Sequence, residues 1–115
     1  MELAGHADQV MCVCTTKEGL ILTGSRDRTL RLWKPHGRCL RTFVGHRSTV
    51  TCISVNRRNI IASGSADHTV RIWDKQLSTS MRTLEGHTDA ITAVLVMETG
   101  TIISASQDTS TYKND

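Results

Sequence analysis

Three residue types that can perform acid–base and nucleophilic chemistry recur along this 115-residue sequence. A Gly-His pair occurs three times, and a Ser-x-Asp stretch follows each pair. Histidine, hydroxyl and carboxylate groups can together activate a nucleophile. However, the histidines of successive Gly-His pairs are 40 and 41 residues apart, and so are the aspartates of successive Ser-x-Asp stretches. Catalysis needs one site, whereas a structural device recurs in every copy of a repeat, so this repetition favours a structural role.

The segments between these residues read as short β-strands. In the first repeat, the alternation of apolar and polar residues over 29–33 has the period of two that is typical of a strand. The first strand of each repeat is the most apolar, and we expect it to lie innermost in a radial arrangement of sheets. The fourth strand is the most polar, and we expect it at the outer rim. The expected strands are 10–14, 20–25, 29–33 and 39–43, then 50–55, 60–65, 69–73 and 80–84.

With these recurring residues and strands the sequence resembles the WD40 repeat family. Repeat two carries Gly45-His46, Ser63-Gly64-Ser65-Ala66-Asp67 and Trp73-Asp74, and repeat one carries Thr23-Gly24-Ser25-Arg26-Asp27 and Trp33-Lys34. The resemblance implies an all-β fold of WD40-type β-propeller blades, two complete and one partial, built as antiparallel four-stranded sheets in an incomplete ring. The expected WD40 region is 1–115, with blade 1 at 5–44, blade 2 at 45–85 and a partial blade 3 with a divergent tail at 86–115.

The resemblance also implies a structural hydrogen-bond chain inside each blade, from tryptophan through a hydroxyl and histidine to aspartate. Ser25 and Ser65 are rival hydroxyls. In the third repeat the tryptophan position holds Asn114, and polar Thr111 and Lys113 replace inward leucines. The expected network residues are His6, Thr23, Asp27 and Trp33, then His46, Ser63, Asp67 and Trp73, and finally His87, Ser104 and Asp108.

A rigid, non-enzymatic scaffold that presents a loop face to protein or peptide partners is the function that the resemblance implies. Fewer than four blades do not close a ring. The chain is therefore expected to be a fragment of a larger propeller, or to self-associate through its open blade edges, or to form an open stack. The candidate partner-binding residues are Met11, Arg26, Thr51, Ala66, Thr92 and Gln107.

Two other functions stay open. The repeats are similar to those of F-box WD-repeat receptors, which present substrates to a ubiquitin ligase and often bind phosphopeptides through arginines. Only Arg26 among the six candidate positions is an arginine. The second alternative is that the chain is a segment of a larger, enzyme-linked WD40 protein. The sequence itself shows no phosphate loop, no metal spacing and no unrepeated acid–base pair, so we expect no enzyme activity, metal or cofactor.

Composition narrows the possible partners. The formal charge is +3, from 14 basic and 11 acidic residues that are scattered along the chain. Nucleic-acid binders concentrate basic residues in a patch, so we expect no nucleic-acid partner. We also expect no membrane span and no signal peptide, and we place the chain inside the cell, in the cytoplasm or nucleus. Cysteines at 12, 14, 39 and 52 are then reduced and serve as small buried hydrophobes rather than metal ligands.

Overall fold

The computed structural model describes residues 5–74 and 80–114, so residues 1–4, 75–79 and 115 of the expected 1–115 repeat region lie outside it. The described residues form strands and turns without helix. The strands are β1 (Val10–Thr15), β2 (Ile21–Ser25), β3 (Thr29–Trp33), β4 (Cys39–Val44), β5 (Val50–Val55), β6 (Ile60–Ser65), β7 (Val70–Asp74), β8 (Ser80–Leu84), β9 (Ile91–Val96), β10 (Ile102–Ser106) and β11 (Thr111–Asn114).

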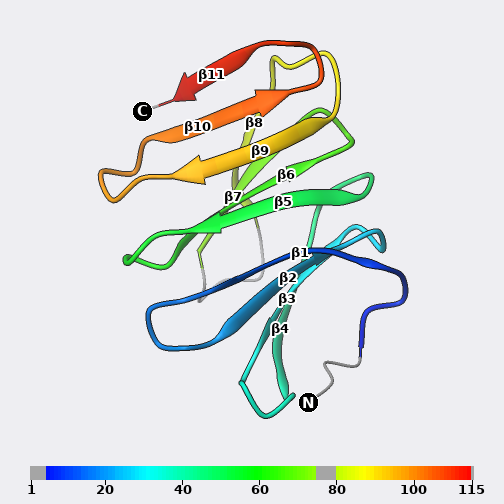
Figure 1. Ribbon diagram of the computed structural model, residues 1–115, viewed down its shortest axis with the longest axis vertical. Coiled ribbons are helices and arrows are strands. Elements are labelled where there is room, and N and C mark those ends of the chain that lie inside the picture. Colours follow the sequence, from blue (N-terminus) through cyan, green and yellow to red (C-terminus); the bar gives the residue numbers. More distant parts are fainter. Residues whose placement is uncertain (1–4, 75–79, 115) are drawn as a thin grey trace.

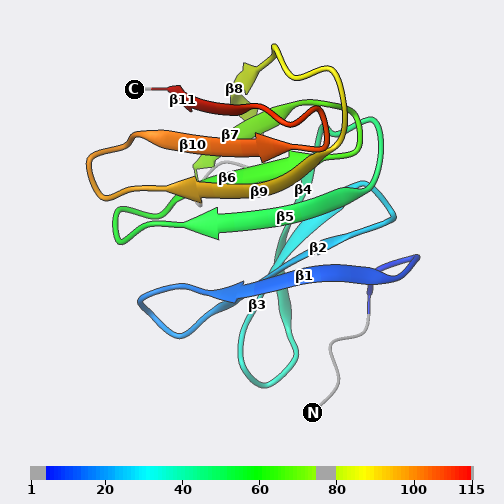
Figure 2. The same ribbon diagram turned by 45° about the horizontal axis from the view of Figure 1, so that its top comes forward.

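These strands form three antiparallel sheets in sequence order. The first holds β1 to β4, the second holds β5 to β8, and the third holds β9 to β11. The sheets stack on one another without closing into a ring (Figures 1 and 2). The expectation of two complete blades and one partial blade in an incomplete ring is confirmed. Among the described residues, no strand pairs with the outer edge of β11.

Two strands begin one residue later than expected. Leu20 closes the turn before β2, because its N–H bonds the Thr16 hydroxyl at 3.2 Å and its carbonyl accepts the Thr16 N–H at 2.9 Å. Thr69 likewise accepts the N–H of Ser65 through its carbonyl at 3.2 Å, and β7 begins at Val70. Leu20 and Thr69 close these turns through backbone hydrogen bonds, which the apolar pattern of the sequence does not reveal.

The first strands of the sheets, β1, β5 and β9, lie side by side (Figure 1). Their apolar composition does not make them the most buried strands. In β1, Val13 is 64% exposed and Met11 is 44% exposed, whereas Leu22 in β2 and Leu30 in β3 are fully buried. The reason is that Leu22 and Leu30 lie on the face that packs against the second sheet, whereas Val13 lies on the opposite, outer face of the first sheet.

Glycines on the middle strands let adjacent sheets approach closely. A Cβ added to Gly64 in β6 would lie 2.5 Å from the Cγ2 atom of Ile91 and 2.6 Å from the sulfur of Cys52. A Cβ on Gly24 in β2 would meet Val50 at 2.6 Å. The third sheet has Ala105 at the equivalent position, where no further sheet is present among the described residues.

The two junctions between sheets differ in chemistry. The first is mainly apolar and includes an edge-to-face contact of Phe43 with Trp73, with ring centroids 5.6 Å apart. The second has an aliphatic core and also polar bridges. There the Thr51 hydroxyl donates to the Ile91 carbonyl at 2.5 Å, and the Asn56 amide donates to the Met97 carbonyl at 3.1 Å.

We expect Gly64→Ala to destabilise the chain by about 1–3 kcal/mol, because overpacking of a tight junction forces neighbouring groups to shift. Ala105→Gly is the matched control at the same repeat position, and should cost about 0.5–1 kcal/mol through backbone entropy alone. Urea denaturation of both variants measures the difference. A Gly64→Ala protein as stable as the wild type would contradict the close approach of the second and third sheets.

Candidate functional site

The expected network of the first sheet is assembled from four parts of the repeat. His6 precedes β1, Thr23 lies on β2, Asp27 lies in the turn after β2, and Trp33 ends β3. The indole Nε1 lies 2.9 Å from the Thr23 hydroxyl, which lies 2.6 Å from His6 Nε2. The other ring nitrogen, Nδ1, lies 2.8 Å from Asp27 Oδ2. These bonds run in the order that the resemblance implies.

Donor and acceptor rules set the direction of this chain. An indole N–H only donates, and an ionised carboxylate only accepts. The Thr23 hydroxyl therefore accepts from Trp33 and donates to His6 Nε2. The Nδ1–H of His6 then donates to Asp27. One neutral histidine tautomer thus satisfies every member of the chain.

The second sheet repeats this geometry. Ser63 accepts the Trp73 indole N–H at 2.8 Å and lies 2.6 Å from His46 Nε2, and His46 Nδ1 lies 3.0 Å from Asp67. The rival hydroxyls have another role. Ser65 donates to the Ser48 carbonyl at 3.2 Å and accepts the N–H of Asp67 at 3.1 Å. In the first sheet Ser25 likewise links the loop to the turn, because it donates to the Gln9 carbonyl at 3.0 Å and accepts the Asp27 N–H at 3.0 Å.

The third sheet keeps only part of the network. His87 contacts Ser104 and Asp108, each at 3.0 Å. No tryptophan is present in this repeat, and Tyr112 instead stacks on the His87 ring, with centroids 4.2 Å apart and planes 18° apart. The sequence reasoning missed this tyrosine, because Tyr112 occupies the position of Arg31 and not that of Trp33. Thr111 and Lys113 are exposed, as their polar character suggests.

A second hydroxyl in each turn was also missed. Thr29 and Thr69 donate to the Oδ1 atoms of the aspartates two residues before them, each at 2.5 Å, and Ser110 donates to Asp108. The same oxygens accept the backbone N–H groups of these residues. The signal was present in the sequence, because Asp-x-Thr/Ser recurs with the period of the repeat.

Hydrogen bonds hold the aspartates ionised. Burial of the Asp67 carboxylate opposes ionisation, but bonds from His46, from Thr69 and from the Arg47 N–H outweigh burial and hold its pKa well below the usual 3.8. The pKa of Asp27 is lowered in the same way, with bonds from Thr29 and His6 outweighing burial. Carboxylates and imidazoles whose bonding capacity is used within the sheet have little left for a substrate, so this geometry serves structure.

Burial disfavours ionisation of the thiols in strand β1 of the first sheet. Burial raises the pKa of Cys12 to about 12, with a further contribution from the neighbouring Cys52 thiol, and burial raises the pKa of Cys14 to about 11. In the part of the chain that the structure describes, no group of three or more His, Cys, Asp or Glu side chains is placed to hold a metal ion.

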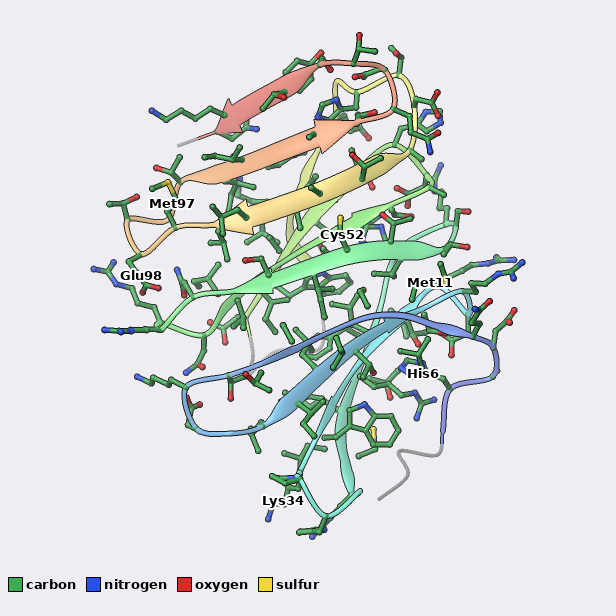
Figure 3. All side chains as sticks on the ribbon, in the orientation of Figure 1. His6, Met11, Lys34, Cys52, Met97 and Glu98 are labelled. Carbon is green, nitrogen blue, oxygen red and sulfur yellow. The ribbon has the colours of Figure 1, made fainter. Side chains whose placement is uncertain are left out.

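The six candidate partner-binding residues lie on β1, β5 and β9 or in the turns after β2, β6 and β10, toward the same end of the sheets. Figure 3 shows Met11 at this end, near His6. The Thr51 hydroxyl is already engaged with the Gly64 and Ile91 carbonyls. The side chains divide by exposure: those of Met11, Arg26, Thr92 and Gln107 are exposed, and those of Thr51 and Ala66 are half-buried.

Comparison with known families identifies the repeat. The model of the family described as WD domain, G-beta repeat, matches residues 1–34, 37–74 and 78–112. A search of curated protein sequences found no match. Across residues 5–74 and 80–114, no helix has the length and apolar character needed to cross a bilayer.

Removal of the central hydroxyl should be more costly where an indole depends on it. Ser63→Ala leaves the Trp73 N–H and His46 Nε2 without their partner, so we expect a loss of about 2–3 kcal/mol. Ser104→Ala removes only the contact with His87, and should cost about 1 kcal/mol. Urea denaturation followed by tryptophan fluorescence measures both. Equal losses would contradict the role of the indole bond.

Acid should unfold the chain by protonating the network aspartates. The pKa of Asp67 is lower in the folded state than the ordinary 3.8, so the unfolded state binds protons more readily. The resulting stability is fully present above the ordinary pKa and is lost as pH falls from about 5 downward through the folded pKa. Denaturation midpoints measured from pH 7 to pH 3 should show this decline.

Asp67→Asn should lower stability at pH 7 and flatten the decline on acidification, because the titrating carboxylate is gone. Asp89→Asn is the matched control, since Asp89 is an exposed carboxylate outside the network. A pH profile for Asp67→Asn that runs parallel to the wild type would contradict the contribution of Asp67.

Proposed function

The chain belongs to the WD40 repeat family, and from this premise we propose that it is a non-enzymatic scaffold that presents the loop end of its sheets to protein or peptide partners. WD40 repeats typically act as protein-interaction scaffolds and are generally non-enzymatic. The observation that carries the proposal is the internal use of the reactive groups. The histidine of each sheet is bonded both to a hydroxyl and to an aspartate of its own sheet.

The loop end suits recognition because its turns are held in one arrangement. The backbone N–H of Arg26 donates to the Gln9 carbonyl at 2.9 Å, and that of Gln107 donates to the Ala90 carbonyl at 3.0 Å. Each turn is thereby fixed to the loop that precedes the first strand of its sheet. Side chains on such a fixed backbone lose little further freedom on binding. We propose that Met11, Arg26, Thr92 and Gln107 make the main contacts, with Thr51 and Ala66 beside them.

We further propose that the stack functions within a larger propeller. Cys12 and Cys14 pack into the first junction, so Val13 between them points to the outer face of the first sheet, where it is 64% exposed. Leu95 is 51% exposed on the outer face of the third sheet. Exposed apolar side chains on both outer faces support additional blades or a second copy as their cover. An intracellular location suits the four free thiols.

Charge reversal at the loop end tests the function. We expect Arg26→Glu to lower partner binding by about tenfold or more, because a rigid contact surface loses a cation and gains an anion. Partners cross-linked to the wild-type chain in cells and quantified by mass spectrometry provide the measurement. Arg38→Glu is the matched control, since Arg38 is exposed in the turn between β3 and β4. An unchanged set of partners in the Arg26→Glu protein would refute recognition at the loop end.

A further inference from the structure

The turns at the opposite end of the sheets carry charges that differ between repeats. The turns between β1 and β2, between β5 and β6, and between β9 and β10 lie one beside another at one edge of the stack (Figure 1). The same turn position holds Lys17 in the first repeat, Arg57 in the second and Glu98 in the third. Figure 3 shows Glu98 at this edge, close to the turn of the second sheet.

At the junction of the second and third sheets, Glu98 satisfies a backbone donor of the neighbouring turn. The Arg57 N–H lies 3.0 Å from one carboxylate oxygen of Glu98 and 3.3 Å from the other. The chain thus shows how this turn binds a carboxylate: an exposed N–H at the turn position is bonded by the side chain from the same position of the next repeat.

At the junction of the first and second sheets the backbone N–H donor is present, but the carboxylate acceptor is not. The Lys17 N–H makes no hydrogen bond within the described part of the chain. The residue that corresponds to Glu98 at this junction is Arg57, and a guanidinium has no lone pair to offer a donor. The Lys17 and Arg57 side chains make no ion pair with any described residue.

A pocket of about 230 Å³ lies at this place, lined mainly by Thr15, Thr16, Lys17, Val55, Arg57 and Glu98. Its lining includes Lys17 and Arg57, and its one carboxylate, that of Glu98, is already bonded to the Arg57 N–H. A water molecule occupies about 30 Å³, so the pocket has room for the end of a glutamate or aspartate side chain. Charge-assisted bonds to a carboxylate are about twice as strong as neutral ones.

We propose that this pocket binds the carboxylate of an acidic side chain of a partner protein, with the carboxylate on the Lys17 N–H as Glu98 lies on the Arg57 N–H. The proposal rests on the proposed scaffold function and adds a second contact site to it. The pocket is at the end of the sheets opposite to Arg26 and Gln107, so the two sites can be tested separately.

The test is a nuclear magnetic resonance titration of the ¹⁵N-labelled chain with the capped peptide Gly-Gly-Glu-Gly-Gly. We expect a saturable shift of the Lys17 amide signal, and no shift with the capped Gly-Gly-Gln-Gly-Gly peptide. Arg57→Glu should abolish the shift, because its own carboxylate would bond the Lys17 N–H as Glu98 does at the next junction. The same substitution should slow hydrogen exchange of the Lys17 amide and raise the denaturation midpoint.

Arg58→Glu is the matched control: Arg58 is the exposed neighbour, the charge change is identical, and the Arg58 side chain does not line the pocket. Binding by this variant should stay within about twofold of the wild type. Equal shifts with the glutamine peptide, equal losses in Arg57→Glu and Arg58→Glu, or a larger Lys17 shift with inorganic phosphate than with the glutamate peptide would each overturn the proposal. None of these results would affect the cross-linking test of Arg26, whose failure would refute recognition at the loop end.

Discussion

A buried hydrogen-bond chain determines how each sheet is organised. In the first sheet, its members come from the loop before β1, from β2, from the turn after β2 and from the end of β3. A buried polar group without a partner costs about 1–3 kcal/mol, so each member depends on the presence of the others. The His6 ring can satisfy both Thr23 and Asp27 only when the loop, the strand and the turn are in place together. The network therefore couples local turn structure to the order of the strands.

The third sheet shows what remains when the tryptophan is missing. Ser104 still contacts His87, and Asp108 still accepts the Thr88 N–H at 2.9 Å. Tyr112 covers the histidine ring by stacking, and its hydroxyl donates to the Gly86 carbonyl at 3.3 Å. The loop and the turn of this sheet thus keep the bond between histidine and aspartate without an indole. The indole bond, which ties the third strand to the second, is the part that this sheet lacks.

Much of the fold was predictable because the repeat multiplies every signal. The period of 40 and 41 residues located His46 and Asp67 together, and the alternation over 29–33 placed β3 correctly. Burial was less predictable, because the exposure of Val13 depends on which sheets surround it rather than on its type. Stacking of Tyr112 on His87 could not be foreseen, because the tyrosine replaces an arginine at a position whose direction is set by β11.

The repeats also serve as internal controls that separate structural residues from residues free to do something else. Positions that carry the same chemistry in all three sheets, such as the aspartate of the turn, serve the fold. Equivalent positions that differ while the backbone stays the same are not required by it. Lys17, Arg57 and Glu98 differ in charge at one turn position, yet each turn closes with the same backbone bonds. Only the third turn carries a carboxylate, that of Glu98, and this carboxylate accepts the backbone N–H of Arg57 in the neighbouring turn. The fold tolerates all three residues, so the sheets do not require the unmatched cations Lys17 and Arg57 at the first junction. Surface features of this kind are available to bind the partners of a scaffold.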